Sequence, residues 1–111
     1  MNPLTTLESS VNNLIVCGRP AEAFERFYHN DVVMQENTSK ATKGKEANRR
    51  REERFDGVVS EMRAELLASA VSDDVSFPEW VYDILLRNGV RWKITETAVR
   101  RWKDGKIVLL P

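Results

Sequence analysis

The sequence has little of several features that mark particular classes of protein. Its 111 residues include one cysteine, Cys17, so no disulfide can form within the chain. No apolar run approaches the roughly 20 residues that span a bilayer. Residues 1–6 are polar and lack the basic and apolar regions of a signal peptide. We therefore expect a cytoplasmic protein with no membrane partner.

The sequence also has no net charge. Lys plus Arg and Asp plus Glu each total 17, whereas proteins that bind nucleic acid normally carry a basic excess. The arginines between residues 49 and 54 alternate with acidic residues at i,i+4 spacing, which is typical of a solvated helix face. We expect no nucleic-acid partner.

Motifs for cofactors and metals are missing as well. The five glycines are scattered and form no phosphate-binding loop, which sets aside the NAD and ATP classes. His29 and Cys17 have no partners at metal-ligand spacing. We expect neither a metal nor another cofactor.

The second half of the sequence contains an antiparallel meander. Asn88-Gly89 and Asp104-Gly105 join three extended runs, and both dipeptides tolerate the positive φ angles of tight hairpin turns. A fourth strand is predicted before them, because apolar and charged residues alternate there with period two, although the composition also suits a helix. The predicted strands cover 60–71, 75–86, 90–102 and 106–110.

The first half has a mostly helical pattern. Thr5 and Glu8 have the spacing of a capping box at the start of the first helix. Pro20 suits the first turn of a second helix, which Tyr28 and His29 close. A short strand at 32–37 and a helix at 45–55 follow. The pattern as a whole predicts one α+β domain over residues 1–111.

Four segments carry a resemblance to a known family: 27–37 (FYHNDVVMQEN), 44–48 (GKEAN), 79–83 (EWVYD) and 101–108 (RWKDGKIV). Their order and spacing resemble the SnoaL-like branch of the nuclear transport factor 2-like superfamily. The resemblance implies a cone-shaped, cystatin-like fold, with three N-terminal helices packed on a strongly curved, mostly antiparallel sheet around an apolar cavity.

The resemblance also implies functions. Members of the superfamily include isomerases, cyclases, dehydratases, hydrolases and non-catalytic binding proteins, and many form homodimers through the outer sheet face. We therefore expect a homodimer. Members usually continue beyond the GKIV segment with a longer last strand, whereas this sequence stops at Pro111, so we expect a short final strand.

Glu96 is the first candidate for acid–base chemistry. Alternation places it on one face of the 90–102 run with Trp92 and Trp102, which we interpret as the concave side of the sheet. Desolvation among apolar side chains would raise its pKa and favour general acid or base work. The alternative is a structural ion pair or a place at the solvent-exposed rim.

Glu36 is the second candidate, because it shares a strand face with Met34. Laid over the ketosteroid isomerase branch of the superfamily, Glu36 falls near the general base. Val11 and either Thr97 or Ala98 fall where that branch has its oxyanion donors. Since an isomerase needs such donors, we expect no steroid isomerisation by that mechanism.

These candidates define a predicted pocket. The catalytic pair is Glu36 and Glu96, and the ligand-binding residues are Tyr28 as a polar anchor with Met34, Trp92 and Trp102 as walls. The leading interpretation is a pocket for a small apolar or aromatic ligand, with cofactor-independent isomerisation, cyclisation or dehydration. The alternative is a non-catalytic homodimerising scaffold whose cavity is filled by its own side chains.

Overall fold

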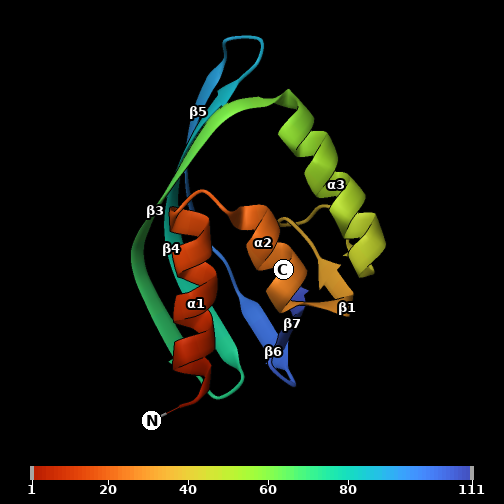
Figure 1. The fold of residues 1–111 in the computed structure, drawn as a ribbon, viewed down its shortest axis with the longest axis vertical. Helices are drawn as coiled ribbons and strands as arrows, with labels where there is room; N and C mark the ends of the chain where they lie inside the picture. The colour runs from red at the N-terminus through yellow and green to blue at the C-terminus, as the bar shows by residue number, and fades with distance from the viewer. Residues whose placement is uncertain (1, 111) are drawn as a thin grey trace.

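The computed structural model describes residues 2–110, which form three helices and seven strands (Figure 1). All seven strands join one curved sheet, and this arrangement confirms the α+β class. The elements are α1 (Leu4–Val16), α2 (Pro20–Phe27), β1 (Tyr28–Met34), β2 (Thr42–Lys43), α3 (Lys45–Val58), β3 (Val59–Ser72), β4 (Val75–Leu86), β5 (Arg91–Thr97), β6 (Arg100–Lys103) and β7 (Lys106–Leu110).

The start of α1 differs from the prediction. The backbone amide of Leu4 donates to Oδ1 of Asn2 at 2.9 Å, whereas no side-chain cap hydrogen bond comes from Thr5. The predicted capping box is therefore wrong, because the Glu8 side chain turns into the protein interior, where it is 2% exposed. Pro20 begins α2 as predicted.

Strand β1 begins earlier than predicted. Tyr28 and His29 lie in β1 and do not close α2, because Tyr28 pairs with Ile107 of β7 in a parallel ladder. The strand ends at Met34, so Glu36 lies beyond it. Helix α3 also continues past its predicted end at residue 55 and includes Gly57.

The sheet order is β2-β1-β7-β6-β4-β3, with β5 paired to β4. Strand β4 pairs with β3 along its length and changes partner on its other side, from β6 at Ser76 to β5 at Glu79. Pro78 occupies this change of partner, where its missing amide breaks no ladder bond and its carbonyl accepts from Ala98 at 3.0 Å. The predicted strand 90–102 is thus two strands.

The hairpin at Asp104-Gly105 has the predicted geometry, because φ is 53° and 77° at its two residues. At the other hairpin only Gly89 has a positive φ, 88°. There Oδ1 of Asn88 accepts a hydrogen bond from the backbone of Val90 at 3.0 Å.

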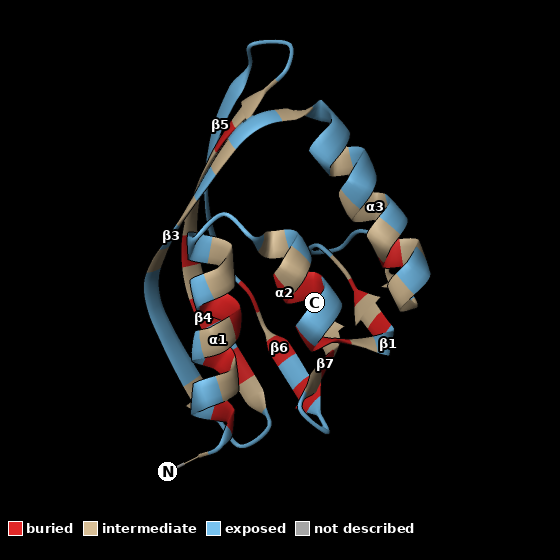
Figure 2. Cartoon of the chain, in the orientation of Figure 1, coloured by how far each residue is buried: buried red, intermediate tan, exposed pale blue. Residues whose placement is uncertain are grey.

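The core lies where α1 and α2 pack on β1, β6 and β7 (Figure 2). Its buried side chains are Leu4, Val11, Ala23, Phe24, Phe27, Tyr28, Val32, Met34, Trp102 and Ile107. Strand β5, in contrast, is exposed along its whole length. No helix within residues 2–110 is long and apolar enough to cross a bilayer.

Candidate functional site

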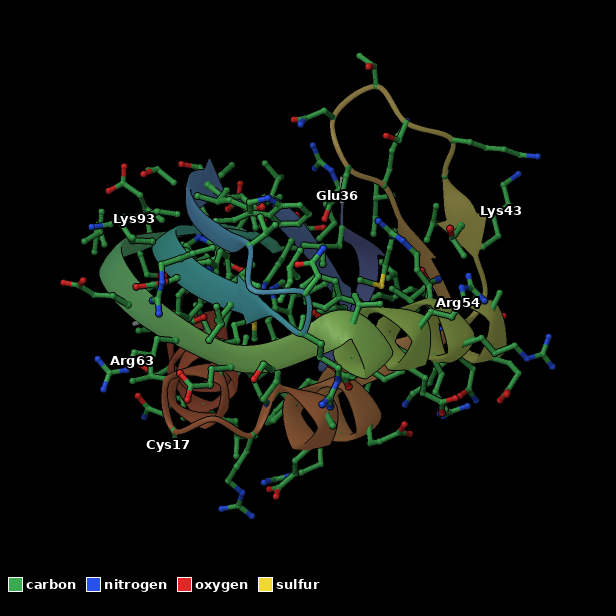
Figure 3. The ribbon with its side chains drawn as sticks, turned by 90° about the horizontal axis from the view of Figure 1, so that it is seen from above. Cys17, Glu36, Lys43, Arg54, Arg63 and Lys93 are labelled. Atoms are coloured by element: carbon green, nitrogen blue, oxygen red, sulfur yellow. The ribbon has the colours of Figure 1, made fainter. Side chains whose placement is uncertain are left out.

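The cross-strand register defines the inner face of the sheet. Trp80 pairs with Glu96, Tyr82 with Ile94, and Ile84 with Trp92. Because directly paired residues share a face, these six side chains lie on one side, with Trp80 and Ile84 buried. The neighbouring rows lie on the other side, where Arg63 and Lys93 point outward from the convex face (Figure 3).

The charge of Glu96 acts on two tyrosines, Tyr82 on this inner face and Tyr28 on β1. Burial raises the pKa of Tyr28 and of Tyr82, and the negative charge of Glu96 raises both further. The positive charge of Arg100 opposes the shift at both hydroxyls. The charges of Glu96 and Arg100 therefore act on both hydroxyls in opposite directions.

Three carboxylates, Glu36, Glu52 and Glu96, are linked by the effects of their charges. Desolvation raises the pKa of Glu96, and the charge of Glu36 adds to it. Burial also raises the pKa of Glu52 on α3; Arg51 opposes this shift, and the charges of Asp56 and Glu36 increase it. Glu36 itself is 69% exposed and lies 3.9 Å from Arg51. The charge of Glu36 therefore acts on both Glu96 and Glu52.

A buried ion pair between Glu8 and Arg100 joins α1 to β6 of the sheet. Nη1 of Arg100 donates to Oε1 of Glu8 at 2.9 Å and to Oδ1 of Asn12 at 2.7 Å. Ser69, Ser76 and Asn12 also donate to the Glu8 carboxylate. Both charged side chains are 3% exposed. Four donors thus fix the carboxylate, and the carboxylate fixes Arg100.

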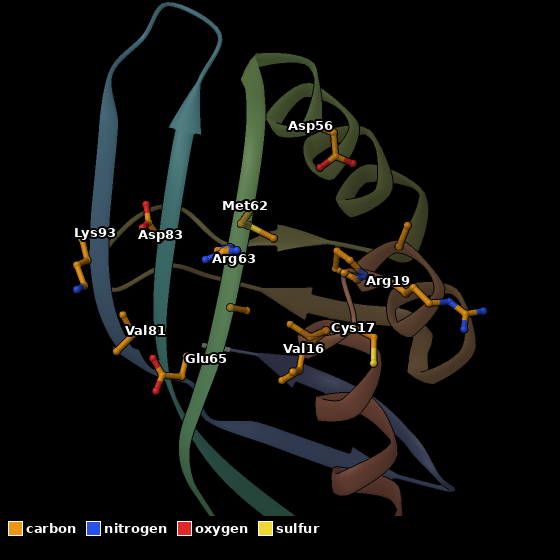
Figure 4. A pocket seen from close by; sticks show the side chains of 15 residues that line it. Val16, Cys17, Arg19, Asp56, Met62, Arg63, Glu65, Val81, Asp83 and Lys93 are labelled. Atoms are coloured by element: carbon orange, nitrogen blue, oxygen red, sulfur yellow. The ribbon is translucent and has the colours of Figure 1, made fainter.

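An open cleft of about 810 Å³ lies beside the concave face (Figure 4). Its walls come from the α1–α2 connection, from Asp56 at the end of α3, and from Met62 and Ala64 of β3. Ala64 pairs with Tyr82, so this wall is continuous with the inner face. The cleft also reaches around the edge of β3 to Lys93 on the convex side. None of the six predicted site residues lines it.

A family model for the SnoaL-like domain matches residues 16–110. The chain belongs to the SnoaL-like family. This confirms the resemblance seen in the sequence. No curated protein sequence is a significant match.

Solved structures confirm the cone-shaped fold of this SnoaL-like protein. A candidate SnoaL-like polyketide cyclase from Mesorhizobium loti is 21% identical, with a TM-score of 0.81 and coverage of 96% of this chain and 95% of that one. An NTF2-like protein of unknown function from Burkholderia pseudomallei is 13% identical, with a TM-score of 0.84 over 99% and 88%. TerC, co-crystallized with polyporic acid, is 13% identical, with a TM-score of 0.79 over 98% and 88%.

The predicted wall residues have different environments. Met34 and Trp102 belong to the packed core, where Nε1 of Trp102 donates to Oγ of Ser76 at 2.9 Å. Trp92 is 46% exposed on the inner face of β5. Tyr28 packs its ring on Phe24 with centroids 4.9 Å apart. Trp92 therefore borders the open part of the site, whereas Tyr28, Met34 and Trp102 belong to the packed core beside it.

Sequence reasoning missed Glu8, Glu52, Tyr82 and Arg100. A signal existed for two of them. Glu8 lies on the apolar stripe of α1 between the buried Leu4 and Val11, and Arg100 follows the inward alternation of its strand. Among the described residues, no three His, Cys, Asp or Glu side chains cluster as metal ligands.

Proposed function

We propose that this SnoaL-like protein binds a small, largely apolar or aromatic molecule on its concave face and catalyses cofactor-independent proton transfer there. The reaction class is isomerisation, cyclisation or dehydration. One observation carries the proposal: Glu96, with a raised pKa, lies on the same face as exposed Trp92 and Ile94 and close to Tyr82. A carboxyl group beside apolar surface suits both ligand contact and proton transfer.

Each polar group has a distinct role in this proposal. Glu96 acts as the general acid or base, because a pKa moved toward neutrality favours proton transfer at physiological pH. Glu36 tunes it through its negative charge. Tyr28 and Tyr82 keep their protons, since their pKa values are raised, and can donate hydrogen bonds to an oxygen that becomes negative during the reaction.

In this proposal the two tyrosines supply the oxyanion donors that the sequence lacks at the positions used by the ketosteroid isomerase branch. The positions that hold oxyanion donors in the ketosteroid isomerase branch carry Val11 and Ala98 here. Tyr28 and Tyr82 supply donors from β1 and β4 instead. The structural likeness to TerC, which was co-crystallized with polyporic acid, supports a small organic ligand. The likeness to a candidate polyketide cyclase supports the cyclase class.

The proposal is tested by hydrogen exchange in a simple ketone. The α-hydrogens of 2-tetralone are followed by NMR in D₂O with wild type, Glu96→Gln and Glu61→Gln, a matched control on the outer face of β3 and outside the cleft. We expect wild type and control to accelerate exchange and Glu96→Gln to lose about 100-fold, the lower end for a general base. Equal rates in all three proteins would remove Glu96 from the mechanism.

Glu36 is tested by the pH dependence of the same exchange. Because the charge of Glu36 raises the pKa of Glu96, Glu36→Gln should move the rising limb of the rate profile to lower pH while it leaves the plateau rate in place. An unmoved profile would contradict the pairing of the two carboxylates.

The second candidate function is a non-catalytic homodimerising scaffold. Phe77 is 37% exposed and Leu67 49% exposed, and Phe77 shares the convex face with Val81. Exposed apolar side chains on a sheet face are typical of an interface. Light scattering tests dimer formation, and Phe77→Asp should produce monomers while Val90→Asp, in the distant hairpin, should not. A dimer without ketone exchange would favour the scaffold over the enzyme.

A further inference from the structure

Arg100 uses only one part of its guanidinium group within the protein. Nη1 makes both hydrogen bonds, to Glu8 and to Asn12. Nε is buried and has no hydrogen-bond partner among residues 2–110, and none is found there for Nη2 either. The residue as a whole is 2% exposed. One edge of a buried cation, Nε with Nη2, is therefore left unused.

This unused edge has a specific chemistry. An arginine side chain presents Nε and the adjacent terminal nitrogen as a planar fork that fits oxygen acceptors. Buried N–H groups are nearly always paired, so an unpaired one leaves room for an acceptor from outside the chain, either an ordered water or a ligand oxygen. Trp80 supplies a second such group, because its Nε1 is also buried without a partner on the inner face.

The surrounding charge limits which oxygen can bind. Glu8 lies 2.9 Å from Arg100 and neutralises it. The charges of Glu52 and Glu96 act on Tyr28 and Tyr82, as that of Arg100 does, and the charge of Glu36 acts on Glu96. A negatively charged ligand would be repelled by these carboxylates. It would gain little attraction from Arg100 in return, because Glu8 already neutralises that charge. A neutral acceptor avoids this penalty. Because Arg100 is almost completely buried, only an oxygen at the end of a ligand can reach its Nε, and the side chains around Arg100 must shift slightly to admit it.

We propose that the Nε edge of Arg100 is the receptor for the carbonyl oxygen of a neutral ketone, enal or quinone whose apolar body lies on the concave face. This rests on the proposed function, since it assumes that the concave face is the ligand site. Arg100 then sets specificity for a carbonyl group, and Glu8 and Asn12 position it by holding Nη1.

The experiment compares three probes that share one aromatic body. The neutral ketone 2-acetonaphthone, the hydrocarbon 2-ethylnaphthalene and the anion 2-naphthoate are titrated into ¹⁵N-labelled protein, and the Nε–H signal of Arg100 and the indole signal of Trp80 are followed by NMR. We expect the ketone to bind about tenfold more tightly than the hydrocarbon, the gain typical of a hydrogen bond to a charged group. The ketone alone should shift the Arg100 signal.

Two variants sharpen the comparison. Arg100→Lys keeps the charge near Glu8 but loses the fork, so the ketone should bind no better than the hydrocarbon, whose affinity should stay unchanged. Arg101→Lys is the matched control on the exposed side of the same strand, and it should leave both affinities as they are. If Arg100→Lys does not fold, the Nε–H signal of the wild-type protein decides alone.

The outcomes separate the two proposals. Equal affinities for ketone and hydrocarbon, or an Arg100 signal that does not move, would overturn the carbonyl receptor, and loss of ketone exchange in Glu96→Gln would still support the proposed function. Tighter binding of 2-naphthoate would overturn the neutral-ligand argument. Failure of all three probes to bind would overturn the concave face as a ligand site, and both proposals with it.

Discussion

The substitution Glu8→Gln tests the buried ion pair most directly. It keeps the shape of the side chain and removes its charge, so Arg100 is left as an uncompensated buried cation. Both side chains are 3% exposed, and Nη1 of Arg100 lies 2.9 Å from Oε1 of Glu8. Breaking such a buried pair costs about 3–5 kcal/mol.

This cost is large for a chain of this size. Single domains unfold with about 5–15 kcal/mol, so Glu8→Gln should remove at least about a fifth of the total. At roughly 4 °C per kcal/mol for a domain near this length, the melting temperature should fall by about 12–20 °C. Urea titration followed by tryptophan fluorescence measures the loss, because Trp80 and Trp102 are both buried.

A double substitution separates the pair from its packing. Arg100→Met combined with Glu8→Gln removes both charges, and replacing a buried pair by apolar groups is often neutral. The double variant should therefore be more stable than the sum of the single losses predicts. Glu46→Gln is the control, since Glu46 pairs with arginines while 64% exposed. A cost for Glu8→Gln within about 1 kcal/mol of this control would refute the reasoning.

Three further predictions concern stability. Burial raises the pKa of Glu52, so the folded state holds this proton more tightly than the unfolded chain does. Stability therefore falls as pH rises from the pKa of the unfolded chain toward the raised pKa of the folded state. Glu52→Gln should stabilise the protein more at pH 7 than at pH 4 in thermal unfolding, and an equal gain at both pH values would contradict this. Gly105→Ala should cost about 1 kcal/mol because φ is 77° there, whereas Gly57→Ala, in α3, should stabilise by about 0.5–1 kcal/mol in the same urea titration. Ser76→Ala should cost about 1–3 kcal/mol, because it leaves the buried Nε1 of Trp102 without an acceptor; a change under 0.5 kcal/mol would show that another group takes over.

Local patterns predicted the strands of the second half well. Strand β4 has the predicted bounds, and β3 forms from a segment whose composition also suited a helix. The period-two alternation correctly indicated a strand there and not a helix, because β4 provides a pairing partner along the whole of β3. The turn at Asp104-Gly105 was equally predictable, since positive φ is a property of the residues themselves.

Long-range pairing explains what the sequence did not reveal. Tyr28 leaves the helix because Ile107 offers it a strand partner, and no local pattern contains that information. Glu8 fits a capping box locally, yet its carboxylate binds Arg100, which is 92 residues further along the chain. The predicted strand 90–102 breaks because β4 exchanges partners at Pro78. Of the candidate site, Glu96 followed from alternation, whereas Glu52 and Tyr82 required the helix and sheet to be placed in space.

The parallel pairing of β1 with β7 has a consequence for how the protein folds. Val33 of β1 pairs with Leu109 of β7, and the same core joins Leu4 and Val11 to Ile107. The hairpins β3–β4–β5 involve near neighbours and can form early, but β1 must wait for a strand far along the chain. Closing so long a loop is slow. During synthesis, β1 therefore lacks its main strand partner until β7 has left the ribosome, and this interval is when the nascent chain most needs protection from aggregation.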